Sequence, residues 1–199
     1  MSPLLWRHGF SILLIKDNLV MNTYENIKEY DAEIIEYGMD MFKTMVIGVI
    51  CSVIIAFIFG ELQKGCAFVL LLLPLRQNAG GLHMKTRGRC AVVSAAIYVA
   101  VLLVFKYICI AKEAQVILYL CLSVVLVMMA PVQNSERLLD KEELKVYGKR
   151  SRLILEIEMI VFMGLIVMHN EQWAMVLLCV LIVADFLIIT GKIKNIKGV

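Results

Sequence analysis

RQNAGGLHMKTRGRC, residues 76–90, is a polar segment between two long apolar runs of the chain. It contains three glycines, four basic residues and a histidine, His83, seven positions before a cysteine, Cys90. In a chain that is mostly apolar, reactive side chains that gather where a helix is interrupted are the natural place to look for chemistry. This segment therefore divides the apolar chain in two and carries its first candidate site.

The composition predicts a polytopic membrane protein. Of the 199 residues, 61% are hydrophobic and 19% are charged, whereas an ordinary soluble domain has about 45–50% apolar and about 25% charged residues. The formal net charge of +3 is too small to indicate a nucleic-acid partner. The six cysteines have no CxxC spacing and lie mostly within apolar runs, so we expect neither a disulfide framework nor a metal site, and no cofactor.

Six apolar segments on the two sides of residues 76–90 approach the length of about 20 residues that a membrane-crossing helix needs. The second is short, so we expect it to be tilted or to begin within the membrane thickness. The predicted spans are residues 44–60, 62–75, 91–111, 114–130, 153–168 and 173–190. The predicted fold is all-α, with six transmembrane helices.

The distribution of Lys and Arg predicts the orientation of these spans, because cytoplasmic connections are rich in basic residues. Basic residues concentrate in residues 76–90, in residues 137–152 and after the last span. The alternate connections contain only Lys64 and Lys112. Both termini and the segment 76–90 are therefore predicted to face the cytoplasm, where that segment can meet a cytosolic substrate.

The chain divides into four predicted parts. Residues 1–20 are either an N-terminal tail or not part of the natural chain, whose start would then be Met21. Residues 21–43 combine spaced apolar residues with Glu and Asp, which indicates an amphipathic cytoplasmic or interfacial helix. Residues 44–190 form the six-span domain, and residues 191–199 form a cytoplasmic basic tail.

Cys90 is placed where a reactive thiolate would be favoured. Cations, a histidine and a helix N-terminus all favour the thiolate, and Arg87, Arg89 and His83 precede Cys90 at the expected start of a span. Had residues 83–90 formed one helix, the two side chains would be about 10 Å apart, beyond hydrogen-bonding reach. The chain must therefore bend between them, and Gly88 permits a bend. The alternative is a basic loop with an incidental histidine and a packed cysteine.

A family resemblance favours the first alternative. The run Arg76, Gly80-Gly81-Leu82-His83 and Cys90, with Ala130-Pro131-Val132 before a basic loop, resembles the accessory gene regulator B (AgrB) family of bacterial membrane cysteine endopeptidases. These enzymes process quorum-sensing propeptides. The resemblance covers residues 22–195, and residues 1–20 fall outside it.

The resemblance implies a cysteine endopeptidase of the bacterial cell membrane with His83 and Cys90 as the catalytic pair. Arg76 and Gly81 match positions that the family requires. Cys90 would attack a carbonyl near the C-terminal side of an AgrD-like propeptide, form a thioester and release the tail, after which an internal thiol or hydroxyl closes a thiolactone or lactone. The family also implies a homodimer in contact with membrane lipid.

The residues suggest which groups could support this reaction. The backbone N–H groups of Gly80 and Gly81, or the side-chain amides of Gln77 and Asn78, are candidate donors to the oxyanion or substrate-positioning groups.

A competing interpretation is a small polytopic transporter or export subunit without peptidase activity. Such a protein would contain paired charges within its spans. For Glu156 and Glu158 we favour pairing with Arg150 or Arg152 over a proton relay. Asp185 is either a functional acid within its span or a residue that snorkels or pairs with Lys192. The chain lacks an HExxH motif, which argues against metal-dependent proteolysis.

Overall fold

The computed structural model describes residue 35 and residues 38–39, 42–81, 87–132 and 140–197. The chain divides into two units, Met1–Gly48 and Val49–Val199. Most of the amphipathic helix expected at residues 21–43 lies outside the described residues. All the functional positions discussed below belong to the second unit.

The described part of the chain is built from α-helices, which confirms the predicted all-α class. The first long helix, Phe42–Phe59, crosses from the first unit into the second. It is followed by α2 (Leu62–Ala79), α3 (Arg87–Tyr107), α4 (Lys112–Met129), α5 (Lys141–Val167) and α6 (Glu171–Lys197).

Four helices have the length and apolar composition needed to cross a membrane. Among the described residues these are Phe42–Phe59, α3, α4 and α6. Several such helices in one chain make it a multi-pass membrane protein, as the composition predicts.

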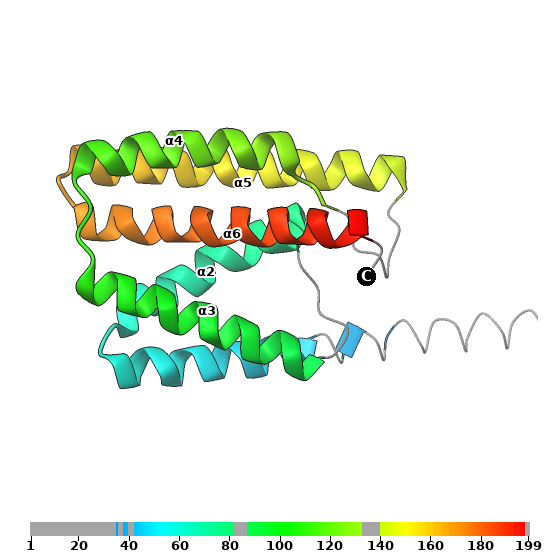
Figure 1. Ribbon diagram of the computed structural model, residues 1–199, viewed down its shortest axis with the longest axis horizontal. Coiled ribbons are helices and arrows are strands. Elements are labelled where there is room, and N and C mark those ends of the chain that lie inside the picture. Colours follow the sequence, from blue (N-terminus) through cyan, green and yellow to red (C-terminus); the bar gives the residue numbers. More distant parts are fainter. Residues whose placement is uncertain (1–34, 36–37, 40–41, 82–86, 133–139, 198–199) are drawn as a thin grey trace, which may run out of the picture. The chain divides into compact units, whose positions relative to one another are not determined.

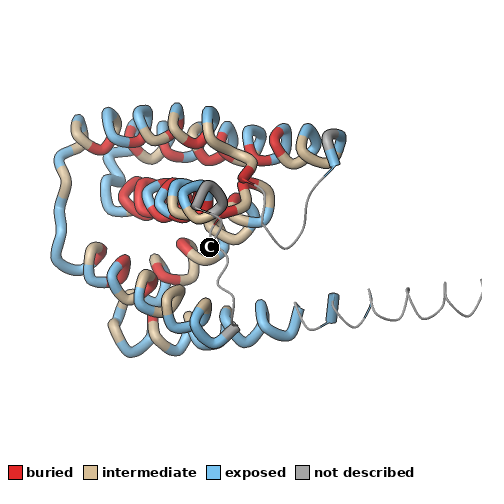
Figure 2. Tube along the Cα trace, turned by 45° about the vertical axis from the view of Figure 1, so that its right-hand side comes forward, coloured by how far each residue is buried: buried red, intermediate tan, exposed pale blue. Residues whose placement is uncertain are grey.

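Helix α6 is the centre of the second unit. It lies between α3 and the pair formed by α4 and α5 (Figure 1) and contacts α2, α3, α4 and α5. Most of it is buried (Figure 2). Several of its side chains have almost no exposed surface, among them Leu177, Leu178, Val180, Leu181 and Ile188.

Aromatic contacts hold the surrounding helices together. Tyr119 of α4 stacks on Phe162 of α5, with ring centroids 4.0 Å apart. Phe68 of α2 contacts Tyr98 and Phe105 of α3, at centroid distances of 5.9 and 6.3 Å. Such pairs contribute packing energy beyond the area that they bury.

One predicted loop proves to be helical. Residues 141–152, expected as part of a basic connection, form the N-terminal turns of α5. The carbonyl of Asp140 accepts the N–H of Leu144 at 2.9 Å, and the Asp140 N–H donates to the Glu143 carboxylate at 3.1 Å. The second bond is one half of a capping box, and the helix that begins here has polar residues that are good helix formers. Hydropathy missed it because these turns are not apolar.

The second predicted span is also longer than expected. Helix α2 continues past residue 75 to Ala79 and contains Pro74. Its last turn therefore includes Arg76 and Gln77, which had been assigned to the polar connection.

Candidate functional site

The candidate site begins where α2 ends. Gly80 terminates the helix with a φ of 77°, and its N–H donates to the carbonyl of Arg76 at 3.1 Å. This left-handed conformation is one that glycine adopts without steric cost. The half-buried Arg76 and the exposed Gln77 occupy the turn just before it.

Gly80 lies against the segment that follows α4. The two form a parallel β-bridge, Gly80 with Val132, and the Val132 N–H donates to the carbonyl of Ala79 at 2.9 Å. A Cβ atom at position 80 would overlap the carbonyl oxygen of Val132. Only a residue without a side chain permits this approach. Sequence reasoning noticed Ala130-Pro131-Val132 only as part of a family pattern and missed its contact with the site.

Gly81 lies against the backbone of α6. It is buried, has a φ of 135°, and a Cβ built on it would lie 3.2 Å from the carbonyl oxygen of Leu187 in α6. The two glycines thus permit both positive φ and close backbone approach, as predicted for them.

Cys90 lies in the first turn of α3, which begins at Arg87, and its side chain is half-buried. The predicted position at a helix N-terminus is therefore confirmed, and the partial positive charge of that terminus favours an anionic group there. The prediction that Gly88 supplies the bend is wrong. Gly88 is the second residue of α3, so any bend between positions 83 and 90 precedes Arg87.

His83, the other member of the predicted pair, lies outside the described residues. The structure thus describes the two ends of the candidate site. One end contains Arg76, Gln77, Gly80 and Gly81, and the other contains Cys90.

Two of the expected oxyanion donors are already engaged. The Gly80 N–H donates to Arg76, and the side-chain amide of Asn78 donates to the carbonyl of Pro74 at 2.8 Å. Both hydrogen bonds close the last turns of α2. The Gly81 N–H is directed at the carbonyl of Val132 by the parallel bridge, because the Val132 N–H already donates to Ala79, so neither expected backbone donor is open.

The buried acids differ from expectation. Glu158 and Asp185 are only 3% and 2% exposed, and their carboxylate oxygens have no hydrogen-bond partner among the described residues. The expected pairing of Glu158 with Arg150 or Arg152 is therefore wrong, as is the snorkelling or pairing of Asp185. The other alternative for Asp185, a functional acid within its span, stays a prediction. Both acids point into the bundle because the helix faces that carry them pack against neighbouring helices rather than against lipid.

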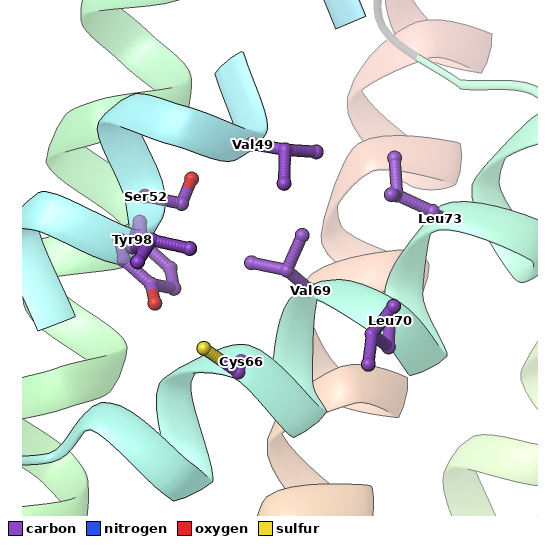
Figure 3. Close-up of a pocket in the computed structure, with 8 residues that line it drawn as sticks. Val49, Ser52, Cys66, Val69, Leu70, Leu73 and Tyr98 are labelled. Carbon is purple, nitrogen blue, oxygen red and sulfur yellow. The ribbon is translucent and has the colours of Figure 1, made fainter. Parts of the chain in front are cut away.

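A cavity of about 190 Å³ lies beside α2. Cys66 and Val69 of α2 face Ser52 of the first helix and Tyr98 of α3 across it (Figure 3). No charged side chain lines it, so it suits hydrocarbon rather than catalysis. Within the described ranges, no three His, Cys, Asp or Glu side chains are grouped so that they could hold a metal ion.

Comparison with known proteins agrees with the motif. The family model of Accessory gene regulator B matches residues 14–190, so the match begins inside the segment 1–20 that we expected to fall outside the resemblance. Protein FsrB of Enterococcus faecalis (strain ATCC 47077 / OG1RF) is 28% identical over 165 residues, which make up 82% of this chain and 66% of the relative. No solved structure matches the chain. Since the family model covers most of the chain, including residues 76–90, the chain belongs to the accessory gene regulator B family.

Proposed function

We propose that the chain is a membrane cysteine endopeptidase that removes the C-terminal tail of an AgrD-like quorum-sensing propeptide. One observation carries the proposal furthest. In a chain of this family, Cys90 lies in the first turn of α3, half-buried, at one end of the segment whose other end is the Gly80–Gly81 turn. A thiolate at a helix N-terminus is stabilised and remains nucleophilic.

The first half of the reaction is acyl transfer to Cys90. The sulfur attacks the scissile carbonyl carbon while the imidazole of His83 accepts the thiol proton. The carbonyl oxygen becomes an oxyanion, which the partial positive charge at the N-terminus of α3 stabilises beside Cys90. The C–N bond then breaks, the leaving amine takes the proton from His83, and the tail departs. The remaining peptide is joined to Cys90 as a thioester.

The second half closes a ring. An internal thiol or hydroxyl of the peptide attacks the thioester carbon, its proton passes to His83, and the sulfur of Cys90 leaves and recovers a proton. The product is a thiolactone or a lactone. Exclusion of water at the membrane surface favours this attack over hydrolysis. The reaction consumes no cofactor.

The topology that fits this reaction has six spans, with α2 and α5 added to the four apolar helices. Helix α5 has 27 residues, about 40 Å at 1.5 Å per residue, so its apolar half can enter the membrane while its basic turns remain outside. Both termini and the candidate site then face the cytoplasm, as the basic residues predict. We further propose a homodimer in the bacterial cell membrane, in contact with lipid.

The test is to express the chain with a matching propeptide and to look by mass spectrometry for a peptide joined to Cys90. Cys90→Ala is expected to abolish tail cleavage, and His83→Ala to reduce it by about 100-fold or more. Cys121→Ala is the matched control, because Cys121 is exposed on α4, away from the site. Continued cleavage in both Cys90→Ala and His83→Ala would show that the peptidase assignment is wrong.

Transport without peptidase activity is the alternative, and the buried acids favour it. Acidic residues within membrane spans often mark an ion or substrate pathway, and the buried Glu158 and Asp185 have no hydrogen-bond partner among the described residues. The same experiment separates the two functions. A carrier would depend on these acids and would retain its activity in Cys90→Ala.

A further inference from the structure

A second close contact involving a glycine lies near the Gly80–Gly81 turn. Pro131, next to the Val132 that pairs with Gly80, packs against α5 at Gly148. A Cβ atom at position 148 would lie 3.3 Å from the Cδ atom of Pro131, a separation at which the ring must shift by a few tenths of an ångström. Gly148 is buried, as is Val132, which is 8% exposed.

These contacts form a continuous series. Helix α5 supports Pro131 at Gly148, Val132 holds Ala79 and Gly80 through a hydrogen bond and a bridge, and α6 contacts Gly81 through the backbone of Leu187. At Gly80 a Cβ atom would overlap the carbonyl oxygen of Val132, and at Gly81 and Gly148 it would force Leu187 or Pro131 to shift by a few tenths of an ångström. The start of the site segment is thereby fixed relative to α5 and α6, which are remote from it in sequence.

We propose that Pro131 and Val132, supported by Gly148, are positioning residues for the chemistry of Cys90. His83 follows Gly81 by two residues in the sequence, so the place where the chain leaves Gly81 sets the place from which His83 must reach Cys90. The segment after α4 thus controls the geometry of the active site without touching the substrate. The inference rests on the proposed function.

Two pairs of glycines allow a matched test. Gly60 and Gly80 have the same φ of 77°, but a Cβ at position 60 meets nothing within 4 Å, whereas one at position 80 meets Val132. Gly60→Ala and Gly80→Ala both place a side chain at positive φ, and only Gly80→Ala displaces Val132. In α5, Gly148→Ala pushes against Pro131, while Gly164→Ala enters open space.

The activity readout is the single-turnover rate of acyl-enzyme formation with saturating propeptide. Gly80→Ala is expected to lower this rate by about 10- to 100-fold, the loss typical of small displacements within an active site. Gly148→Ala is expected to lower it less, because the shift is transmitted through Pro131. Propeptide binding and the thermal unfolding temperature of Gly148→Ala should stay close to those of Gly164→Ala.

A second readout does not depend on the propeptide. The rate at which iodoacetamide alkylates Cys90, followed by mass spectrometry, should fall in His83→Ala, Gly80→Ala and Gly148→Ala, and should stay at the wild-type rate in Gly60→Ala and Gly164→Ala. Hydrogen exchange at the Val132 amide should accelerate in Gly80→Ala.

The outcomes separate the two proposals. Absence of any peptide adduct on Cys90 in the wild type would contradict the proposed function. The positioning role is overturned if Gly80→Ala and Gly148→Ala alkylate Cys90 at the wild-type rate, if their controls lose as much, or if His83→Ala leaves alkylation unchanged. Should Gly80→Ala fail to fold, Gly148→Ala against Gly164→Ala decides.

Discussion

Helices α6 and α3 are both long and apolar enough to cross a membrane, yet α6 is mostly buried in the protein and α3 is mostly exposed. In the apolar window of α6, 78% of the residues are buried inside the protein, against 17% in α3. Helix α6 contacts four other helices, so protein surrounds it on most sides. Helix α3 leaves large apolar side chains such as Val92, Leu103 and Tyr107 exposed. Hydropathy therefore identifies a span but does not tell whether its neighbours are lipid or protein.

The difference in burial between α6 and α3 is visible in their sequences only once the exposed residues are known. The exposed apolar residues of α6, Ile182, Phe186, Ile189 and Ile193, recur at helical spacing and form one stripe. Asp185 lies outside that stripe and is buried. Helix α3, the more exposed helix, carries the candidate nucleophile in its first turn. The core helix thus contacts the candidate site through Leu187, and the more exposed helix carries the proposed nucleophile.

The largest expected effect concerns the two ends of α3. A natural cysteine near each end can show on which side of the membrane that end lies. Cys90 lies in its first turn, and the exposed Cys109 lies two residues after its last residue, Tyr107. If α3 crosses the membrane with its N-terminus inside, a membrane-impermeant maleimide added to intact cells labels Cys109 and leaves Cys90 unmodified. Both are labelled after the cells are broken, as measured by peptide mass spectrometry.

Cys109→Ala is the control for this experiment, because it should remove the external label. Labelling of Cys90 in intact cells would instead place the site on the outer face and contradict the proposed orientation.

A smaller but measurable effect concerns packing in the two helices. Leu178 of α6 is fully buried and Leu103 of α3 is 41% exposed. Leu178→Ala is expected to lower the free energy of unfolding by about 2–5 kcal/mol, because it leaves a cavity. Leu103→Ala should cost about 1 kcal/mol or less, since lipid or detergent replaces the lost contact. Denaturant unfolding in detergent micelles measures both, and equal losses would remove the distinction between the two helices.

The smallest expected effect concerns the buried acid of α6. Asp185 loses its contact with water and has no hydrogen-bond partner among the described residues. Replacing such a group by an apolar one of similar size removes its desolvation cost, so Asp185→Leu is expected to raise the free energy of unfolding by about 1–3 kcal/mol.

Measuring both the activity and the stability of Asp185→Leu shows whether this acid takes part in the reaction. A more stable Asp185→Leu protein that still cleaves the propeptide would identify Asp185 as dispensable for the reaction, whereas a stable and inactive one would give this acid a functional role. Loss of stability would show that Asp185 has a stabilising partner.

Much of the fold could be predicted because membrane helices are specified locally. The four helices that satisfy the length and composition of a span were all expected, with boundaries within a few residues. The predicted boundaries are wrong where a helix begins or ends at polar residues or at glycine, because hydropathy does not mark such ends. The N-terminal turns of α5 depend on Asp140 and Glu143 at a helix cap, and the end of α2 depends on Gly80 rather than on its last leucine.

The sequence by itself determined the helical membrane class and placed Cys90 at the start of a helix. It also placed Gly80 and Gly81 where positive φ is needed. These features follow from hydropathy, helix geometry and the conformational freedom of glycine, which are local properties.

Only the tertiary structure decided that α6 is the core, that Glu158 and Asp185 are buried, and that Val132 and Leu187 contact the Gly80–Gly81 turn. The contacts of Gly80 with Val132 and of Gly81 with Leu187 join residues 52 and 106 positions apart in the sequence. They depend on which helix faces pack together, and an apolar face suits lipid and protein alike.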